Sequence, residues 1–185
     1  MREMYNLYQL ATEAINNLNA IGIYPHLTPS DFKVNTRATY RYGQTRKRKG
    51  IYSVNISAFL LDKRNDEKSV MTTIYHECLH CCDDCMCHTG KWKEYAELVS
   101  DCYNVDITRC SSFREKLDES VFKEHRDKVC QRREKNRYRY FCYCEDCGSR
   151  IERIMYRAPK WHTQTNKFHC KNCQSTHLTT WKEKA

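Results

Sequence analysis

The sequence predicts an α+β fold followed by a small metal-stabilised unit. Apolar residues recur at three- and four-residue intervals in three segments before residue 104, which is typical of half-buried helices. Between the first two of these segments, apolar and polar residues alternate twice, as in strands with one buried face. After residue 139, two pairs of closely spaced cysteines stand among aromatic residues. We therefore expect one domain in residues 1–110, a basic helical connector in 111–139 and a cysteine-rich unit in 140–185.

The chain has 185 residues, enough for one domain with a hydrophobic core and a small appendage. Its formal net charge of +9 favours a polyanionic partner, of which nucleic acid is the commonest. The other interpretation is that the charge only keeps the protein in solution. Composition alone leaves both interpretations open.

Thirteen cysteines would suggest disulfide bonds in a secreted protein. The N-terminal segment, however, has neither the apolar region nor the cleavage site of a signal peptide, and no run of about 18 apolar residues offers a membrane span. We therefore expect an intracellular protein without membrane contact: cytoplasmic, or nucleoid-associated or nuclear according to its host. In such compartments thiols stay reduced, and clustered cysteines more often bind metal.

The first expected helix spans residues 3–19 and ends at the Gly and Pro residues that follow. Residues 32–42 then alternate between apolar and polar side chains, and so do residues 52–58. With the segment GQTRKRKG as a basic turn, these two runs predict a long antiparallel hairpin. The buried face of its first strand would contain Phe32, Val34, Ala38, Tyr40 and Tyr42.

Basic residues are concentrated in this hairpin. Seven of them, and no acidic residue, occur between residues 33 and 50. They could contact phosphate groups, or they could form a solvated hairpin tip. They are Lys33, Arg37, Arg41, Arg46, Lys47, Arg48 and Lys49.

The second expected helix contains the pattern HExxH, formed by His76, Glu77 and His80. Residues four apart lie one above the other on a helix, so the two imidazoles can bind one metal ion. The pattern is typical of zinc hydrolases, in which a third protein ligand completes the cage and a water takes the open position. Zinc lowers the pKa of that water from 15.7 to about 7, and Glu77 would take its proton as general base.

The ends of this helix and of the next one are also predicted. Asp66 or Ser69 is expected to cap the HExxH helix at its start. A third helix is expected from Lys91 to Tyr103. Its buried face would contain Trp92, Tyr95, Ala96, Val99 and Cys102.

A further helix is expected from residue 111 to about 136, with Ser112 and Glu115 as a capping box. Apolar residues repeat every four positions along it. Residues 107–140 contain eleven Lys or Arg and six Asp or Glu, so we expect a connector with a solvated basic face that could touch DNA.

The last segment contains two CxxC pairs separated by 22 residues. Two such pairs place four thiolates around one Zn²⁺, and the metal replaces the core that a unit of some 40 residues is too small to build. We predict a zinc ribbon with one structural Zn²⁺. Cys142 and His169 are close enough to be substitute ligands but are second choices. The predicted ligands are Cys144, Cys147, Cys170 and Cys173.

These motifs together resemble the SprT-like metallopeptidases. The resemblance rests on HExxH in mid-chain, His88 with Trp92 four residues later, and the four-cysteine ribbon. The ISAFLL segment before the HExxH helix and the DITR segment after the third helix also occur in the expected order, so the resemblance covers nearly the whole chain. The family includes the Spartan-type proteases, which digest proteins covalently trapped on DNA. The resemblance implies a small zincin-like domain in residues 1–110.

The resemblance also implies roles for single residues. His76, His80 and His88 would bind a catalytic Zn²⁺, Glu77 would be the general base, and Trp92 would seat the helix that follows the third ligand. The implied activity is cleavage of DNA-associated or DNA-crosslinked proteins, with DNA, single-stranded DNA included, as a partner. Aromatic residues among the basic ones of the ribbon could stack on bases, or they could fill its small core.

The chain departs from the family pattern after the motif. Only seven residues separate the second histidine from His88, and Thr89 stands where family members more often have glycine. In this shorter connection Asp84, Cys85 or Cys87 could reach the metal instead of His88. Five cysteines surround the motif, which could reflect small residues in a tight loop, redox control or a second metal. They are Cys78, Cys81, Cys82, Cys85 and Cys87.

The leading functional hypothesis is therefore a zinc peptidase recruited to DNA. The alternative is a non-proteolytic nucleic-acid-binding regulator with two structural zinc sites, the first closed by Cys85 or Cys87. The presence of Glu77 argues against it, because a structural site needs no buried carboxylate beside the metal. A third hypothesis is a non-proteolytic hydrolase on the same scaffold.

Overall fold

The computed structural model describes residues 3–38, 40–109 and 116–185. It is α+β, as the sequence predicts, and it divides into two compact units, Met1–His125 and Arg126–Ala185. This division falls inside helix α5 (Glu119–Lys135). It differs from the two boundaries that the sequence predicts, near residues 110 and 139. Within the described ranges, every helix is too short or too polar to cross a membrane.

Three helices form much of the first unit: α1 (Leu7–Ala20), α2 (Glu67–Leu79) and α3 (Lys91–Tyr103). The first begins four residues later than predicted because Asn6 caps it, accepting hydrogen bonds from the backbone of the first turn. Of the two expected caps of α2, Asp66 is the one that the structure has, since its carboxylate accepts from the amide of Ser69 at 3.1 Å. The bounds of α3 agree with the prediction.

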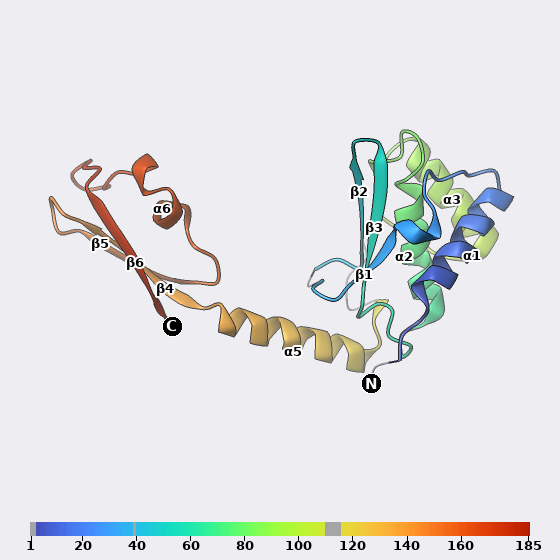
Figure 1. The fold of residues 1–185 in the computed structure, drawn as a ribbon, viewed down its shortest axis with the longest axis horizontal. Coiled ribbons are helices and arrows are strands. Elements are labelled where there is room, and N and C mark those ends of the chain that lie inside the picture. The colour runs from blue at the N-terminus through green and yellow to red at the C-terminus, as the bar shows by residue number, and fades with distance from the viewer. Residues whose placement is uncertain (1–2, 39, 110–115) are drawn as a thin grey trace. The chain divides into compact units, whose positions relative to one another are not determined.

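The first unit also has a three-stranded sheet, and the helices lie on one side of it (Figure 1). A short 3₁₀ turn, η1 (Pro29–Asp31), leads into the sheet. Its strands are β1 (Phe32–Asn35), β2 (Gly43–Arg48) and β3 (Ile51–Ser57), in the order β1-β3-β2. Strand β3 lies in the middle, parallel to β1 and antiparallel to β2. Strand β2 is therefore at one edge of the sheet.

The predicted long hairpin is wrong in its first strand and in its turn. The hairpin joins β2 to β3 through Lys49 and Gly50, whose φ angles of 51° and 81° are those of a tight two-residue turn. Most of the segment expected to be the turn is therefore strand β2. Strand β1 stops at Asn35, and the predicted buried residues Val34 and Tyr40 are exposed. Alternation predicted a strand here but could not identify its partner.

The core of the first unit lies between the sheet and the helices. Strand β3 contributes Tyr52, Val54 and Ile56 from its inner face, all of them buried. Val70 and Ile74 of α2 are fully buried against this cluster. Since most of α2 is buried, the helix that contains HExxH is fixed on several sides.

Helix α5 (Glu119–Lys135) begins in the first unit and continues into the second. Its first half contributes Val121 to the core of the first unit. The helix begins later than the predicted residue 111, and the expected capping box of Ser112 and Glu115 lies outside the described residues.

The second unit is built on a three-stranded antiparallel sheet, in the order β5-β4-β6. Its strands are β4 (Tyr138–Cys144), β5 (Arg150–Met155) and β6 (Leu178–Lys184), with a short helix α6 (Lys160–Thr163) and a 3₁₀ turn η2 (Thr165–Lys167) between the last two. Tyr140 and Phe141 of the central strand are buried. With so few buried aromatic side chains, the unit has a small core, and we expect a metal held by its cysteines to stabilise it.

Candidate active site

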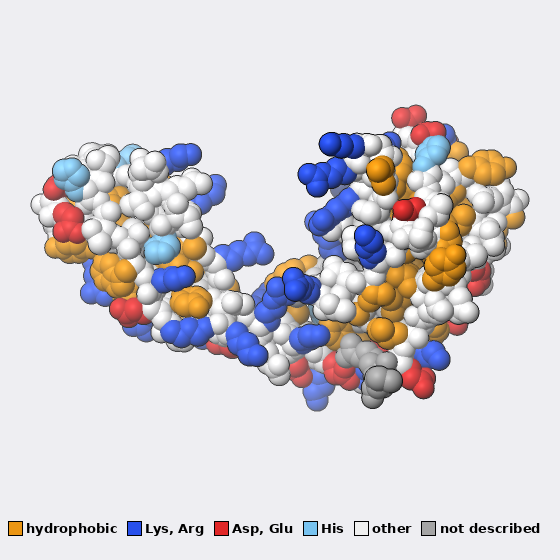
Figure 2. All heavy atoms as spheres, in the orientation of Figure 1, with side chains coloured by type: hydrophobic (Ala, Val, Ile, Leu, Met, Phe, Trp, Pro, Cys, Tyr) orange, Lys and Arg blue, Asp and Glu red, His pale blue; other side chains and the backbone are white. Residues whose placement is uncertain are grey.

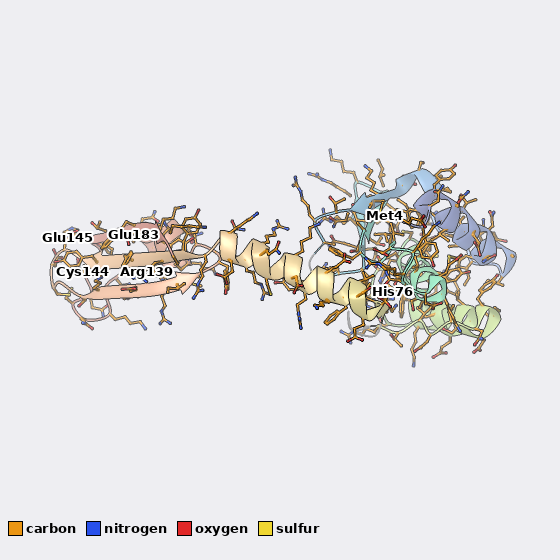
Figure 3. The ribbon with its side chains drawn as sticks, turned by 90° about the horizontal axis from the view of Figure 1, so that it is seen from below. Met4, His76, Arg139, Cys144, Glu145 and Glu183 are labelled. Atoms are coloured by element: carbon orange, nitrogen blue, oxygen red, sulfur yellow. The ribbon has the colours of Figure 1, made fainter. Side chains whose placement is uncertain are left out.

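Helix α2 brings two of the predicted ligands to one end of the first unit. His76 lies in its last turn and is labelled in Figure 3, and His80 is the residue that ends the helix. The third, His88, comes from the loop before α3. Helical spacing explains the first pair, whereas only the tertiary fold brings in the third histidine.

The Nε2 atoms of the three histidines face one another. They lie 3.3 Å apart for His76 and His80, 3.1 Å for His80 and His88, and 3.0 Å for His76 and His88. Nitrogen ligands at about 2.0–2.1 Å from a tetrahedral Zn²⁺ would be separated by about 3.3 Å. The three histidines therefore fit a single metal ion of that size.

The protonation of these imidazoles also suits a cation. His80 Nδ1 lies 2.8 Å from the carbonyl oxygen of Cys85, which can only accept, so the proton is on Nδ1 and the lone pair on Nε2. Burial lowers the pKa of all three histidines, that of His76 to about 3. A backbone hydrogen bond with Thr108 partly offsets the shift of His76. Neutral imidazoles with converging lone pairs repel one another unless a cation lies between them.

Trp92 packs against the three histidines and is almost fully buried. Its ring centroid lies 5.0 Å from that of His76, 5.6 Å from His80 and 4.6 Å from His88. This placement matches the packing role expected for it. By filling the space behind the rings, Trp92 limits the directions in which each imidazole can turn.

Glu77 is buried beside strand β2. The hydroxyl of Thr45 lies 2.6 Å from Glu77 Oε2 and 3.0 Å from the Glu77 carbonyl oxygen, so its single proton goes to the nearer carboxylate. Burial raises the pKa of Glu77, and the hydrogen bonds from Thr45 and the positive charge of Arg41 oppose that rise. A carboxylate with a raised pKa is a stronger base than an exposed one.

Gly43 leaves the room that Glu77 occupies. A Cβ at this position would lie 2.4 Å from Glu77 Oε1 and 2.6 Å from its Cγ. Both distances are far below van der Waals contact, so any side chain at position 43 would displace Glu77 or the strand. Strand β2 thus fixes the carboxylate twice, through the hydroxyl of Thr45 and the missing side chain of Gly43.

The roles of Thr45 and Gly43 were missed at the sequence level. Both belong to the segment expected to be a turn, and β2 has no buried apolar residue that would produce a period-two signal. The glycine alone was a possible signal, because a glycine inside a strand often marks a close approach of another group.

The substitute ligands proposed for the first site do not gather there. Among the described residues, the group that could hold a metal consists of His76, His80 and His88, without Asp84, Cys85 or Cys87. Cys85 approaches the site through its backbone oxygen instead. With three protein ligands, a tetrahedral ion would keep one position open.

Four cysteines of the cluster around the motif are buried, and Cys87 is exposed. Burial raises the pKa of Cys81 and of Cys82 to about 12, so these thiols stay protonated near neutral pH. Protonated, buried thiols react slowly, which favours the interpretation that they are small packing residues. The other two buried members are Cys78 and Cys85.

The four predicted ribbon cysteines converge in the second unit, where Figure 3 labels Cys144. The Sγ atoms of Cys144 and Cys173 are 3.5 Å apart, and those of Cys147 and Cys170 are 3.6 Å apart. Ligands at about 2.3 Å from a tetrahedral ion would be separated by about 3.8 Å, so the site fits one Zn²⁺. Backbone N–H groups of Cys173 and Asn172 lower the pKa of Cys170 to about 6. The second choices, Cys142 and His169, are outside this group.

No protein-family model matches the chain, and no curated protein is significantly similar to it.

Proposed function

We propose that this protein is a zinc-dependent metallopeptidase of the SprT-like, zincin type that acts on DNA-associated or DNA-crosslinked proteins. One observation supports the enzymatic part above all others. Three neutral imidazoles converge on one point, and Glu77, which directly follows His76 in α2, has a buried carboxylate. A site that only bound metal would gain nothing from that carboxylate and would bear the cost of burying it.

The chain's own residues have distinct tasks in this proposal. His76, His80 and His88 would hold the ion through Nε2. When bound there, Zn²⁺ supplies a Lewis acid that polarises a carbonyl oxygen and acidifies a water. The carboxylate of Glu77 would accept the proton of that water and return it to the leaving amine. Thr45 keeps that carboxylate oriented by donating to Oε2.

Features of the ribbon support DNA as the partner. Phe141 and Trp181 stack at 4.9 Å between ring centroids, and the guanidinium of Arg150 lies 4.8 Å from the Phe141 ring. Trp181 remains partly exposed on this face, and on the opposite face of the same small sheet Lys182 and Lys184 lie over Tyr138. Aromatic rings interleaved with cations are typical of proteins that stack and neutralise a single strand.

The non-proteolytic regulator has less support. It needs a fourth protein ligand at the histidine site, and among the described residues no thiol or carboxylate joins the three imidazoles. The third hypothesis, a hydrolase of other esters or amides, uses the same site and differs from the proposed peptidase only in its substrate.

The experiment compares wild type with Glu77→Gln, a variant of nearly the same shape without the basic oxygen. Both are assayed for cleavage of a DNA-binding protein with and without single-stranded DNA, and for zinc content. We expect cleavage that the variant loses while it keeps two zinc ions per chain. Absence of cleavage by the wild type under every DNA condition would overturn the proposal and favour the regulator.

A further inference from the structure

A polar pocket of about 230 Å³ opens beside strand β2 in the first unit. Two arginines, three side-chain amides and a phenol line it, and none of the described lining residues is acidic. A cavity of this kind offers many hydrogen-bond donors and a positive charge, which suits an anion. These residues are Asn35, Arg37, Tyr40, Arg41, Gln44 and Asn55.

Strand β2 separates the pocket from the proposed general base. Gly43 belongs to its wall, and a Cβ on Gly43 would touch the carboxylate of Glu77. Arg41, another lining residue, is close enough for its charge to lower the pKa of Glu77. A ligand seated in the pocket would therefore lie across strand β2 from Glu77, with the backbone of Gly43 between them.

Basic side chains continue from the pocket along the outer face of β2. Gln44, Arg46 and Arg48 alternate with residues that face the helices, so all three project from the side of the sheet that the helices leave uncovered. The guanidinium of Arg46 donates to Gln44 Oε1 at 2.9 Å, which links this row to the pocket. Figure 2 shows Lys and Arg side chains gathered over β2.

We propose that this pocket binds a phosphate of a single-stranded nucleic acid whose backbone continues along Arg46 and Arg48. Phosphodiester oxygens suit the planar guanidinium groups of Arg37 and Arg41. A carboxylate of an acidic peptide would also suit the pocket alone. The row of cations that follows favours a polyanion, because a chain with regularly spaced charges neutralises all of them. The inference rests on the DNA-directed part of the proposed function and places a strand of nucleic acid on the outer face of β2, whose inner face contacts Glu77.

The test measures binding of a fluorescent single-stranded oligonucleotide to the full chain at several salt concentrations. The variant is Arg37→Gln with Arg41→Gln, and its charge-matched control is Lys63→Gln with Lys93→Gln, two lysines outside the pocket and the outer face of β2. Each single-strand phosphate contact contributes about 0.7 to the slope of log affinity against log salt concentration. In about 0.1 M salt this contact therefore strengthens binding about fivefold relative to about 1 M salt. Since the pocket holds one phosphate, we expect the pocket variant to lose about fivefold in affinity and about 0.7 in slope.

A second pair of variants avoids large changes of side-chain volume. Gln44→Glu places a negative charge in the pocket, and Gln9→Glu adds the same charge on α1. We expect the first to weaken oligonucleotide binding and the second to leave it nearly unchanged. Circular dichroism spectra equal to that of the wild type ensure that all variants are folded.

Equal affinities and slopes for pocket and control variants would overturn the inference, and so would oligonucleotide binding too weak to detect in the wild type. Binding of a glutamate-rich peptide that depends on Arg37 and Arg41, without an effect of these residues on oligonucleotide binding, would assign the pocket to acidic peptide instead. Peptidase activity is measured separately, so loss of cleavage in Glu77→Gln can hold while the phosphate site fails, and the reverse.

Discussion

At the scale of single residues, strand β2 controls Glu77 by contacts that involve no metal ligand. Thr45 donates to Oε2 at 2.6 Å, and the backbone of Gly43 lies where any side chain would collide with the carboxylate. Catalysis by a general base depends on its geometry within fractions of an ångström. In the proposed enzyme these two residues would therefore position the general base, and each gives a testable prediction.

Thr45→Val keeps the size of the side chain and removes the hydroxyl. Because a buried carboxylate oxygen then lacks its donor, we expect kcat/KM to fall about tenfold or more at unchanged zinc content. Thr45→Ser, which restores a hydroxyl, should recover most of the loss in the same peptidase assay. Equal activity of the Val and Ser variants would contradict a role for the hydrogen bond.

Gly43→Ala adds one methyl group against Glu77. The collision distance of 2.4 Å requires the carboxylate or the strand to move. We expect a loss of activity of about 100-fold, as displacements near 1 Å produce, and a destabilisation of about 1–3 kcal/mol. Peptide cleavage and chemical denaturation measure the two effects, and wild-type activity would show that the site has room to spare.

At the scale of elements, the sequence predicted the helices better than the sheet. Helix α3 buries one face and α2 is buried on several sides, and in both the repeat of apolar residues is local in the sequence. Strand β2 buries no complete face, so its sequence resembles that of a basic turn. The end of β1 depends on a parallel pairing with β3, about twenty residues away in the sequence. Such non-local pairing leaves no signal in the strand itself.

The start of α2 can be tested through its cap. The Asp66 carboxylate accepts from the Ser69 amide, which satisfies one of the unpaired N–H groups of the first turn. We expect Asp66→Ala to lower the free energy of unfolding of the first unit by about 1 kcal/mol. Hydrogen exchange of α2 amides reports this quantity, with Asp66→Asn, which keeps an acceptor, as the control. Faster exchange in neither variant would show that the cap contributes nothing.

The residues of the two candidate sites also differed in how well the sequence predicts them. The pair His76 and His80 followed from helical spacing, whereas His88 in its short loop depended on a resemblance. Thr45 precedes Glu77 by 32 residues, and no spacing rule connects them. The cysteine pairs were predictable because the two short knuckles specify four ligands by themselves.

At the scale of the whole molecule, the chain has two candidate metal sites in two separate units. Thiolate and imidazole ligands belong to different elements, so removing one site should leave the other intact. Since the second unit has few buried side chains, we expect its stability to depend on a bound metal more than that of the first unit does.

Cys147→Ser combined with Cys170→Ser tests this independence. We expect zinc content to fall from two ions to one, the ribbon to become sensitive to limited proteolysis, and cleavage of a DNA-independent peptide to persist. Mass spectrometry of the proteolytic fragments identifies the unfolded part. Loss of both ions in this variant would mean that the two units do not hold their metals separately.

The central claim is that His76, His80 and His88 together hold one zinc ion. Elemental analysis of purified wild type and of His88→Ala, both in reducing buffer and after exhaustive dialysis, tests it most directly. From the proposed function we expect two zinc ions per chain in the wild type and one in the variant, with loss of peptidase activity in the latter. Two ions in the variant would contradict the claim, and so would a single ion in the wild type.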